Sequence, residues 1–96
     1  MKLFATVYTA MPLEELVQSI CSAQWSCEKI SDTEYSLQGD GVQLTVEGGG
    51  DVLMFGEVKL ELSEIDLWVA GFAKLSMSYN IDLHADEARL IRRYQQ

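Results

Sequence analysis

Three side chains able to bind a metal or to act in acid–base catalysis lie close together near the C-terminal end of the sequence. His84 is the only histidine, and Asp82 and Asp86 flank it at two-residue spacing. On a strand the three would share a face, whereas in a linker followed by a helix start they need not. No HExxH or DxDxDG motif and no Cys/His pair accompanies them. We therefore expect an exposed, non-catalytic His84, no metal site and no cofactor.

Two cysteines, the serines and a glycine triplet are the other candidates for chemistry. Cys21 and Cys27 stand six residues apart, a spacing that fits neither a zinc site nor a disulfide framework, so we expect both thiols to be reduced and buried. No serine lies in a nucleophile-elbow motif. The triplet at 48–50 precedes a strand pattern and is flanked by Glu47 and Asp51, which favours a hairpin loop over a phosphate site. The sequence thus indicates a protein that is not an enzyme.

Charge is the strongest signal in the sequence. Its 96 residues carry 15 acidic and 7 basic side chains, a formal net charge of −8, which disfavours nucleic acid and anionic membranes as partners. Six acids and one lysine fall between residues 47 and 66, and the three arginines all lie in the last eleven residues. We predict that the acids form a partner-binding surface; they are Glu47, Asp51, Glu57, Glu61, Glu64 and Asp66.

The elements that would position these residues follow from hydrophobic periodicity. Residues 2–9 alternate two apolar or β-prone sets and predict a central strand covered on both faces. A helix is expected over 12–23, opening at Pro12. Patterns of period two then predict strands over 25–30, 33–38, 42–47 and 52–62, an antiparallel meander. Within the last of these, a bulge or tight hairpin at Gly56 would bring Leu53 and Phe55 into register with Val58.

The C-terminal third is open to two interpretations. Ser63 and Asp66 approximate a capping box, and a helix is predicted over 64–79 with Trp68 and Phe72 on its core stripe. Residues 77–83 also alternate, so residues 76–84 could be helix or strand. We favour a helix that ends at an αL residue, Asn80, and a last helix over 85–94 that carries the arginines. Trp25, at a strand start, is assigned to the core.

Together these elements predict one α+β domain spanning residues 1–96. It has a four- to six-stranded, mainly antiparallel sheet in the order β-α-β-β-β-β-α, a short C-terminal helix, and helices packed on one face. The N-terminus lacks the long apolar core of a signal peptide and no stretch is long enough to span a membrane, so we expect a cytoplasmic protein, in bacteria or another reducing compartment.

Three functions are compatible with these features. The favoured one is a small acidic protein that docks on a basic protein, such as a toxin or nuclease-like effector, and inhibits it. Bacterial immunity proteins against nuclease toxins and phage-encoded inhibitors of nucleic-acid-binding effectors are often small acidic domains, an analogy of size and charge alone. The alternatives are a self-associating domain, for example a homodimer, whose acidity serves solubility, and a small-ligand or metal-binding enzyme using His84.

Overall fold

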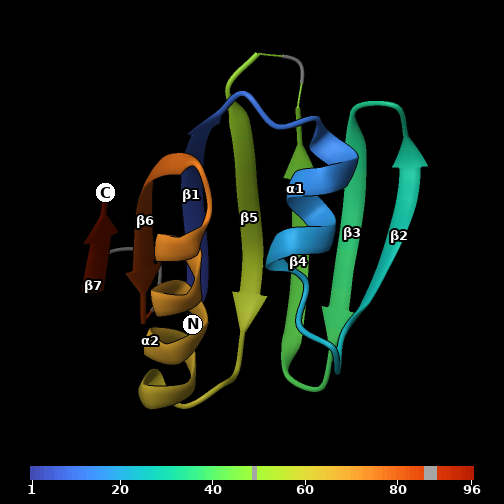
Figure 1. Cartoon of the computed structure of the whole chain (residues 1–96). Coiled ribbons are helices and arrows are strands. Elements are labelled where there is room, and N and C mark those ends of the chain that lie inside the picture. The colour runs from blue at the N-terminus through green and yellow to red at the C-terminus, as the bar shows by residue number, and fades with distance from the viewer. Residues whose placement is uncertain (49, 86–88) are drawn as a thin grey trace.

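An antiparallel sheet forms the centre of the computed structural model, which describes residues 1–48, 50–85 and 89–96 (Figure 1). In the described residues it has seven strands in the spatial order β2-β3-β4-β5-β1-β6-β7. Their bounds are β1 Lys2–Thr9, β2 Ser26–Ser31, β3 Glu34–Gly39, β4 Val42–Glu47, β5 Val52–Val58, β6 Met77–His84 and β7 Leu90–Gln95. The meander of β2 to β5 returns to pair with β1, and the hairpin of β6 and β7 lies on the other side of β1.

Two short helices cover one face of this sheet and leave the other uncovered (Figure 1). They are α1, Leu13–Ile20, and α2, Leu62–Ala70, which runs into a 3-10 turn at Gly71–Lys74. α1 buries Leu16, Val17 and Ile20, and α2 with its 3-10 turn buries Ile65, Val69 and Phe72. This confirms the predicted α+β class with a mainly antiparallel sheet and helices on one face, although the sheet has more strands than expected.

β1 lies centrally, between β5 and β6, as predicted. It is covered on only one face: Leu3, Ala5 and Val7 are buried, whereas Phe4 is 53% and Tyr8 44% exposed. The expectation of two covered faces is therefore wrong. Apolar residues at alternate positions do not reveal which set the helices cover, because both sets of β1 are β-prone.

Gly56 neither forms a bulge nor ends a strand. The pairing of β1 with β5 runs without a register shift from Lys2 opposite Glu57 to Val7 opposite Val52. Gly56 instead allows close approach of the neighbouring strand: its φ is +153°, and a Cβ atom there would lie 2.0 Å from the carbonyl oxygen of Gln43. Leu53 and Phe55 consequently remain on the uncovered face, and the predicted shift in their register is wrong.

The C-terminal third differs most from the prediction. α2 and its 3-10 turn end at Lys74, and β6 follows, so the alternating pattern at 77–83 indicated the correct structure. Asn80 is a strand residue, and no non-glycine residue in the described ranges has a positive φ. The predicted helix over 85–94 is wrong, because residues 90–95 form β7 on the edge of the sheet; residue 86, the third candidate metal ligand, lies outside the described residues.

The capping box of α2 also lies two residues earlier than predicted. Glu61 is the N-cap, and the Glu64 carboxylate accepts a hydrogen bond from the Glu61 backbone N–H at 3.2 Å. Ser63 and Asp66 therefore do not cap the helix. Acidic residues can fill both positions of the box because carboxylates are stabilised at the positive end of a helix.

Candidate functional site: a cleft between the helices

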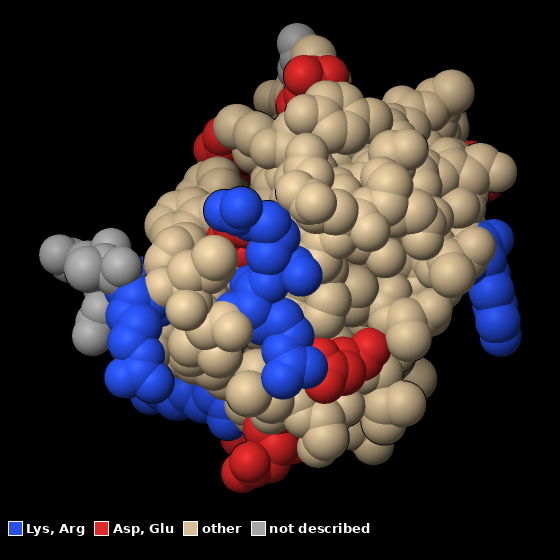
Figure 2. Space-filling view, turned by 90° about the vertical axis from the view of Figure 1, so that its left-hand side faces the viewer, with Lys and Arg blue, Asp and Glu red and all other residues tan. Residues whose placement is uncertain are grey.

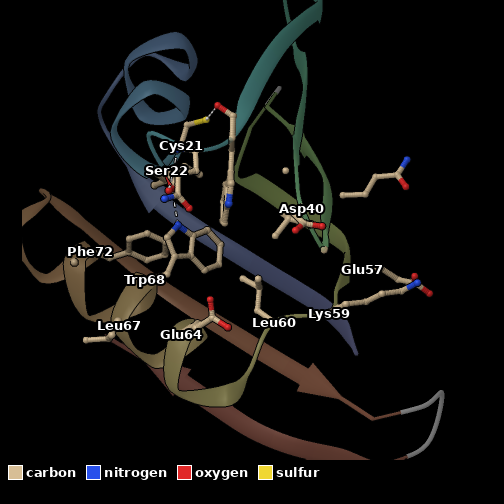
Figure 3. A pocket seen from close by; sticks show the side chains of 18 of the residues that line it. Cys21, Ser22, Asp40, Glu57, Lys59, Leu60, Glu64, Leu67, Trp68 and Phe72 are labelled. Atoms are coloured by element: carbon tan, nitrogen blue, oxygen red, sulfur yellow. Dashed lines mark hydrogen bonds between the residues drawn. The ribbon is translucent and has the colours of Figure 1, made fainter.

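A cleft of about 1110 Å³ lies between the end of α1, the β3–β4 turn and α2 (Figure 3). Four parts of the chain line it: the end of α1 with the α1–β2 connection, the β3–β4 turn with the start of β4, the end of β5 with the β5–α2 connection, and α2 with its 3-10 turn. A concave surface built from four segments is the usual setting of a binding site. The lining residues that carry its chemistry are Trp25, Asp40, Leu60, Glu64 and Trp68.

The two tryptophans of the chain form the aromatic wall of the cleft. The ring centroids of Trp25 and Trp68 are 5.2 Å apart and the ring planes make an angle of 57°. The indole Nε1–H of Trp68 donates a hydrogen bond to the carbonyl oxygen of Ile20 at 2.8 Å. Trp25 lies directly against the backbone of Gly39, where a Cβ atom would come within 2.4 Å of the indole Cδ1. Both indoles are thus held in place while part of each remains exposed.

Aromatic packing continues from this wall into the core. The ring centroids of Trp68 and Phe72 are 4.9 Å apart, and those of Phe72 and Tyr79 are 5.7 Å apart, both edge to face. Such pairs stabilise by about 0.5–1.5 kcal/mol beyond their buried area. The wall is therefore rigid, which lowers the entropic cost of binding against it.

Carboxylates surround the same space. Figure 3 shows Asp40 from the β3–β4 turn, Leu60 from the β5–α2 connection and Glu64 from α2 around the region in front of Trp68. Gly41, with a φ of +77°, turns the chain after Asp40, and its carbonyl oxygen accepts a hydrogen bond from the Lys59 backbone N–H at 2.6 Å. The lining contains three carboxylates, Asp40, Glu57 and Glu64, and one ammonium group, Lys59.

The six acids predicted to bind a partner do not form a single surface. Glu57 and Glu64 line the cleft, with Glu57 on the side away from Trp68 (Figure 3), and Glu61 caps α2 next to it. Glu47 points to the uncovered face at the end of β4, opposite Leu53, and Asp51 lies in the β4–β5 hairpin loop.

Asp66, the sixth acid, is committed to the edge of the sheet. Its carboxylate accepts a hydrogen bond from the Tyr94 hydroxyl at 2.5 Å and pairs with the Arg92 guanidinium at 2.7 Å. These two partners hold the pKa of Asp66 below its usual value, with the Tyr94 hydroxyl the larger cause. Figure 2 looks onto this edge and shows basic side chains beside acidic ones. The contact ties α2 to β7.

Two of the three residues first considered for metal or acid–base chemistry, Asp82 and His84, contact other side chains in the described part of the chain. Asp82 accepts two hydrogen bonds from the Arg93 guanidinium, at 2.7 and 3.2 Å, which lower the pKa of its carboxyl. His84 packs edge to face on Phe4, with ring centroids 6.1 Å apart. Within residues 1–48, 50–85 and 89–96, no group of three or more His, Cys, Asp or Glu side chains could hold a metal ion.

The cysteines occupy different environments, although both were predicted to be buried. Cys21 is half-buried behind the tryptophan wall, and its thiol donates a weak hydrogen bond to the Trp25 carbonyl oxygen at 3.9 Å. Burial, with a smaller effect of Cys27, raises the pKa of Cys21 to about 11. Cys27 is exposed, because β2 is an edge strand over which neither helix extends. The buried role predicted for Cys27 is therefore wrong.

Comparison of the chain with protein families, with curated proteins and with solved structures gives no significant match. Among the described residues, no helix has the length and apolar character needed to cross a bilayer. The inference of function therefore depends on the site itself.

Sequence reasoning missed the cleft although it identified several of its parts. Trp25 and Trp68 were assigned to the core, and Asp40 lies in the short segment between the predicted strands over 33–38 and 42–47. The α1–β2 connection and the β3–β4 turn become neighbours of α2 only through the sheet order, which brings Ile20 and Trp68 together across 48 positions. The signal that could have found the site is the pairing of a tryptophan at a strand start with a Gly-Asp-Gly turn.

Proposed function

We propose that this protein is a non-enzymatic binding protein that docks on a basic protein partner and inhibits it by occupying its functional surface. The observation that supports the proposal is the cleft, in which a rigid two-tryptophan wall faces the carboxylates of Asp40 and Glu64. The overall charge of −8 would accelerate association with such a partner.

The chemistry of the cleft matches a lysine or arginine side chain of the partner. The aliphatic stem of such a residue packs along an indole, and its cationic head lies over the ring face or between the carboxylates. The indole rings and the carboxylates both favour a cation. An anionic side chain would be repelled by three of the four charged lining residues. Tryptophan and arginine are also the residue types that most often dominate the binding energy of protein interfaces.

The cleft suits an anchor for a protein rather than a catalytic centre. Its carboxylates are exposed and the cleft is open on the surface, whereas acid–base catalysis uses carboxyl groups whose pKa values burial has shifted toward neutral pH. No nucleophile–base pair is found among the described lining residues.

Intrinsic fluorescence gives a direct test, because both tryptophans of the chain line the cleft. We expect an arginine-rich peptide without tryptophan to change the emission and to saturate it, and a glutamate-rich peptide of equal length to have no effect. The double variant Asp40→Asn/Glu64→Gln should raise the Kd of the arginine-rich peptide at least about tenfold, since two charge-assisted contacts are lost. Glutamine at position 64 can still accept the capping hydrogen bond.

A charge-matched control separates the cleft from the acidity of the whole molecule. Glu47→Gln/Asp51→Asn removes the same two charges at exposed positions that do not line the cleft. We expect this variant to bind within about threefold of the wild type, because only long-range attraction is reduced. Equal losses in the two double variants would contradict the proposal, as would equal binding of the two peptides.

A further inference from the structure

The uncovered face of the sheet exposes apolar side chains at its centre. Phe4 is 53% and Leu53 44% exposed, and the strand register places Phe4 beside Phe55 and Thr6 beside Leu53. A hollow of about 320 Å³ lies among these side chains. The helices lie on the opposite face (Figure 1), so none of the described elements covers this apolar centre. Contiguous exposed apolar surface of this kind marks an interaction site.

A row of side chains crosses this face from one edge of the sheet to the other. Residues directly opposite one another in antiparallel strands point to the same face, and the pairings link one residue from every strand. From β2 to β7 the row is Glu28, Ser36, Thr45, Phe55, Phe4, Asp82 and Arg93. It is acidic at the β2 end and aromatic at the centre, and it ends at β7 in Arg93, whose guanidinium donates two hydrogen bonds to the neighbouring Asp82.

We propose that this face binds a second copy of the chain about a two-fold axis that runs parallel to β5 and passes beside Phe55. This rotation reverses the order of the strands in the second copy relative to the first, and it leaves each residue at the same height along the strand direction. Phe55 then meets its own copy, and Thr45 lies opposite Phe4 of the second copy. Glu28 of each copy lies opposite Arg93 of the other, so at both ends of the row a second carboxylate joins the ion pair that Arg93 makes with Asp82. A two-fold interface must be complementary to itself in this way.

Charge also selects this axis over the other two-fold arrangement of two stacked sheets. An axis perpendicular to the strands and through the row would place Glu28 against its own copy, which repels at the β2 end. At the β7 end it would set the Asp82–Arg93 ion pair against its own copy, which contributes little either way. Under the proposed axis the like-charged contact is Glu57 with its own copy, and Lys2 lies directly beside Glu57 in the sheet, which offsets that charge.

The size of the face lies at the lower end of the range for a stable dimer, about 600–1,000 Å² per partner. Seven strands at a spacing of about 4.8 Å, with roughly six residues each, present on the order of 600 Å². A stable interface buries about 800 Å² of accessible surface per partner, and face-to-face packing of sheets within about 30° of alignment is a common arrangement. Glu57, at the side of the cleft away from Trp68, would lie in this interface, whereas the tryptophan wall lies on the helix side and each copy would keep it open.

Sedimentation equilibrium of the full chain tests the dimer. We expect a concentration-dependent monomer–dimer equilibrium, and we expect Phe55→Glu to raise the dimer Kd at least about thirtyfold, because two carboxylates would then meet at the axis. The matched control is Leu67→Glu, which adds the same charge on α2, where the side chain is 76% exposed; it should leave the Kd unchanged. Circular dichroism checks that each variant is folded.

Mixing two single variants tests the axis itself. Glu28→Arg alone and Arg93→Glu alone each place like charges together at both ends of the row, and each should weaken the dimer about tenfold. In an equimolar mixture, the mixed dimer regains both ion pairs, and its affinity should return to that of the wild type. Three outcomes would overturn the proposal: a chain that is monomeric at every concentration, a Phe55→Glu dimer of unchanged Kd, or a mixture that dimerises no more tightly than the single variants.

Discussion

The contact between Trp25 and Gly39 gives the sharpest link between local packing and the proposed binding site. A Cβ atom at position 39 would lie 2.4 Å from Cδ1, 2.9 Å from Cγ and 3.0 Å from Nε1 of the Trp25 indole. Gly39→Ala therefore requires the indole to move, and the ring contact with Trp68 at 5.2 Å is lost or distorted. Forcing a methyl group into a packed site costs about 1–3 kcal/mol, and the aromatic pair contributes about 0.5–1.5 kcal/mol.

We expect Gly39→Ala to lower the free energy of unfolding by about 1–3 kcal/mol. We also expect it to raise the Kd of the arginine-rich peptide, since the displaced indole no longer completes the wall. Urea unfolding followed by circular dichroism gives the first quantity, and the fluorescence titration gives the second. Gly50→Ala is the control, because no heavy atom lies within 4 Å of a Cβ built there. If the two variants matched in both stability and peptide affinity, Trp25 would not be held against Gly39.

Three further predictions follow from individual contacts. Gly56→Ala should lower the free energy of unfolding by about 3 kcal/mol or more, measured by urea unfolding, because the backbone of the neighbouring strand blocks the new Cβ. The pKa of Asp66 is lowered from its usual 3.8, so its interactions stabilise the folded state above that pH and are lost as the pH falls through the lower folded value. Asp66→Asn should therefore make the loss of stability in acid less steep, as measured by thermal unfolding at a series of pH values. Iodoacetamide should modify Cys27 well before Cys21, whose pKa is about 11; mass spectrometry of peptides would show the order, and equal rates would contradict it.

Local patterns predicted most of the strands because period-two alternation matches a sheet with one covered face. The strands around residues 35 and 44 follow such patterns, with Tyr35, Leu37, Leu44 and Val46 buried. The same rule predicted strand character at 77–83, where a longer helix was preferred. A helix-compatible spacing of apolar residues continued past Lys74, and pairing of β6 with the central strand decided the outcome.

The last strand could not be predicted because its own residues carry no strand pattern. Half of residues 90–95 are charged or amide side chains and the apolar ones do not alternate. They become a strand by pairing with β6 and by the contacts of Arg92 and Tyr94 with Asp66. The cleft escaped prediction for a different reason: Asp40, Glu64 and Trp68 are far apart in the sequence and meet only when the sheet order is known. Net charge is the basis for proposing a basic partner, and the fold is needed to propose where such a partner would bind.

Nuclear magnetic resonance titration of the uniformly ¹⁵N-labelled chain with the arginine-rich peptide tests the cleft most directly. The two indole N–H signals of the chain both come from tryptophans that line the cleft. We expect these signals and the backbone amides of Asp40 and Glu64 to shift together and to saturate at one Kd. Two results would contradict the cleft as the site that binds a basic partner. One is shifts centred on Phe4 and Phe55, and the other is shifts spread over Glu47 and Asp51 with the indole signals unmoved.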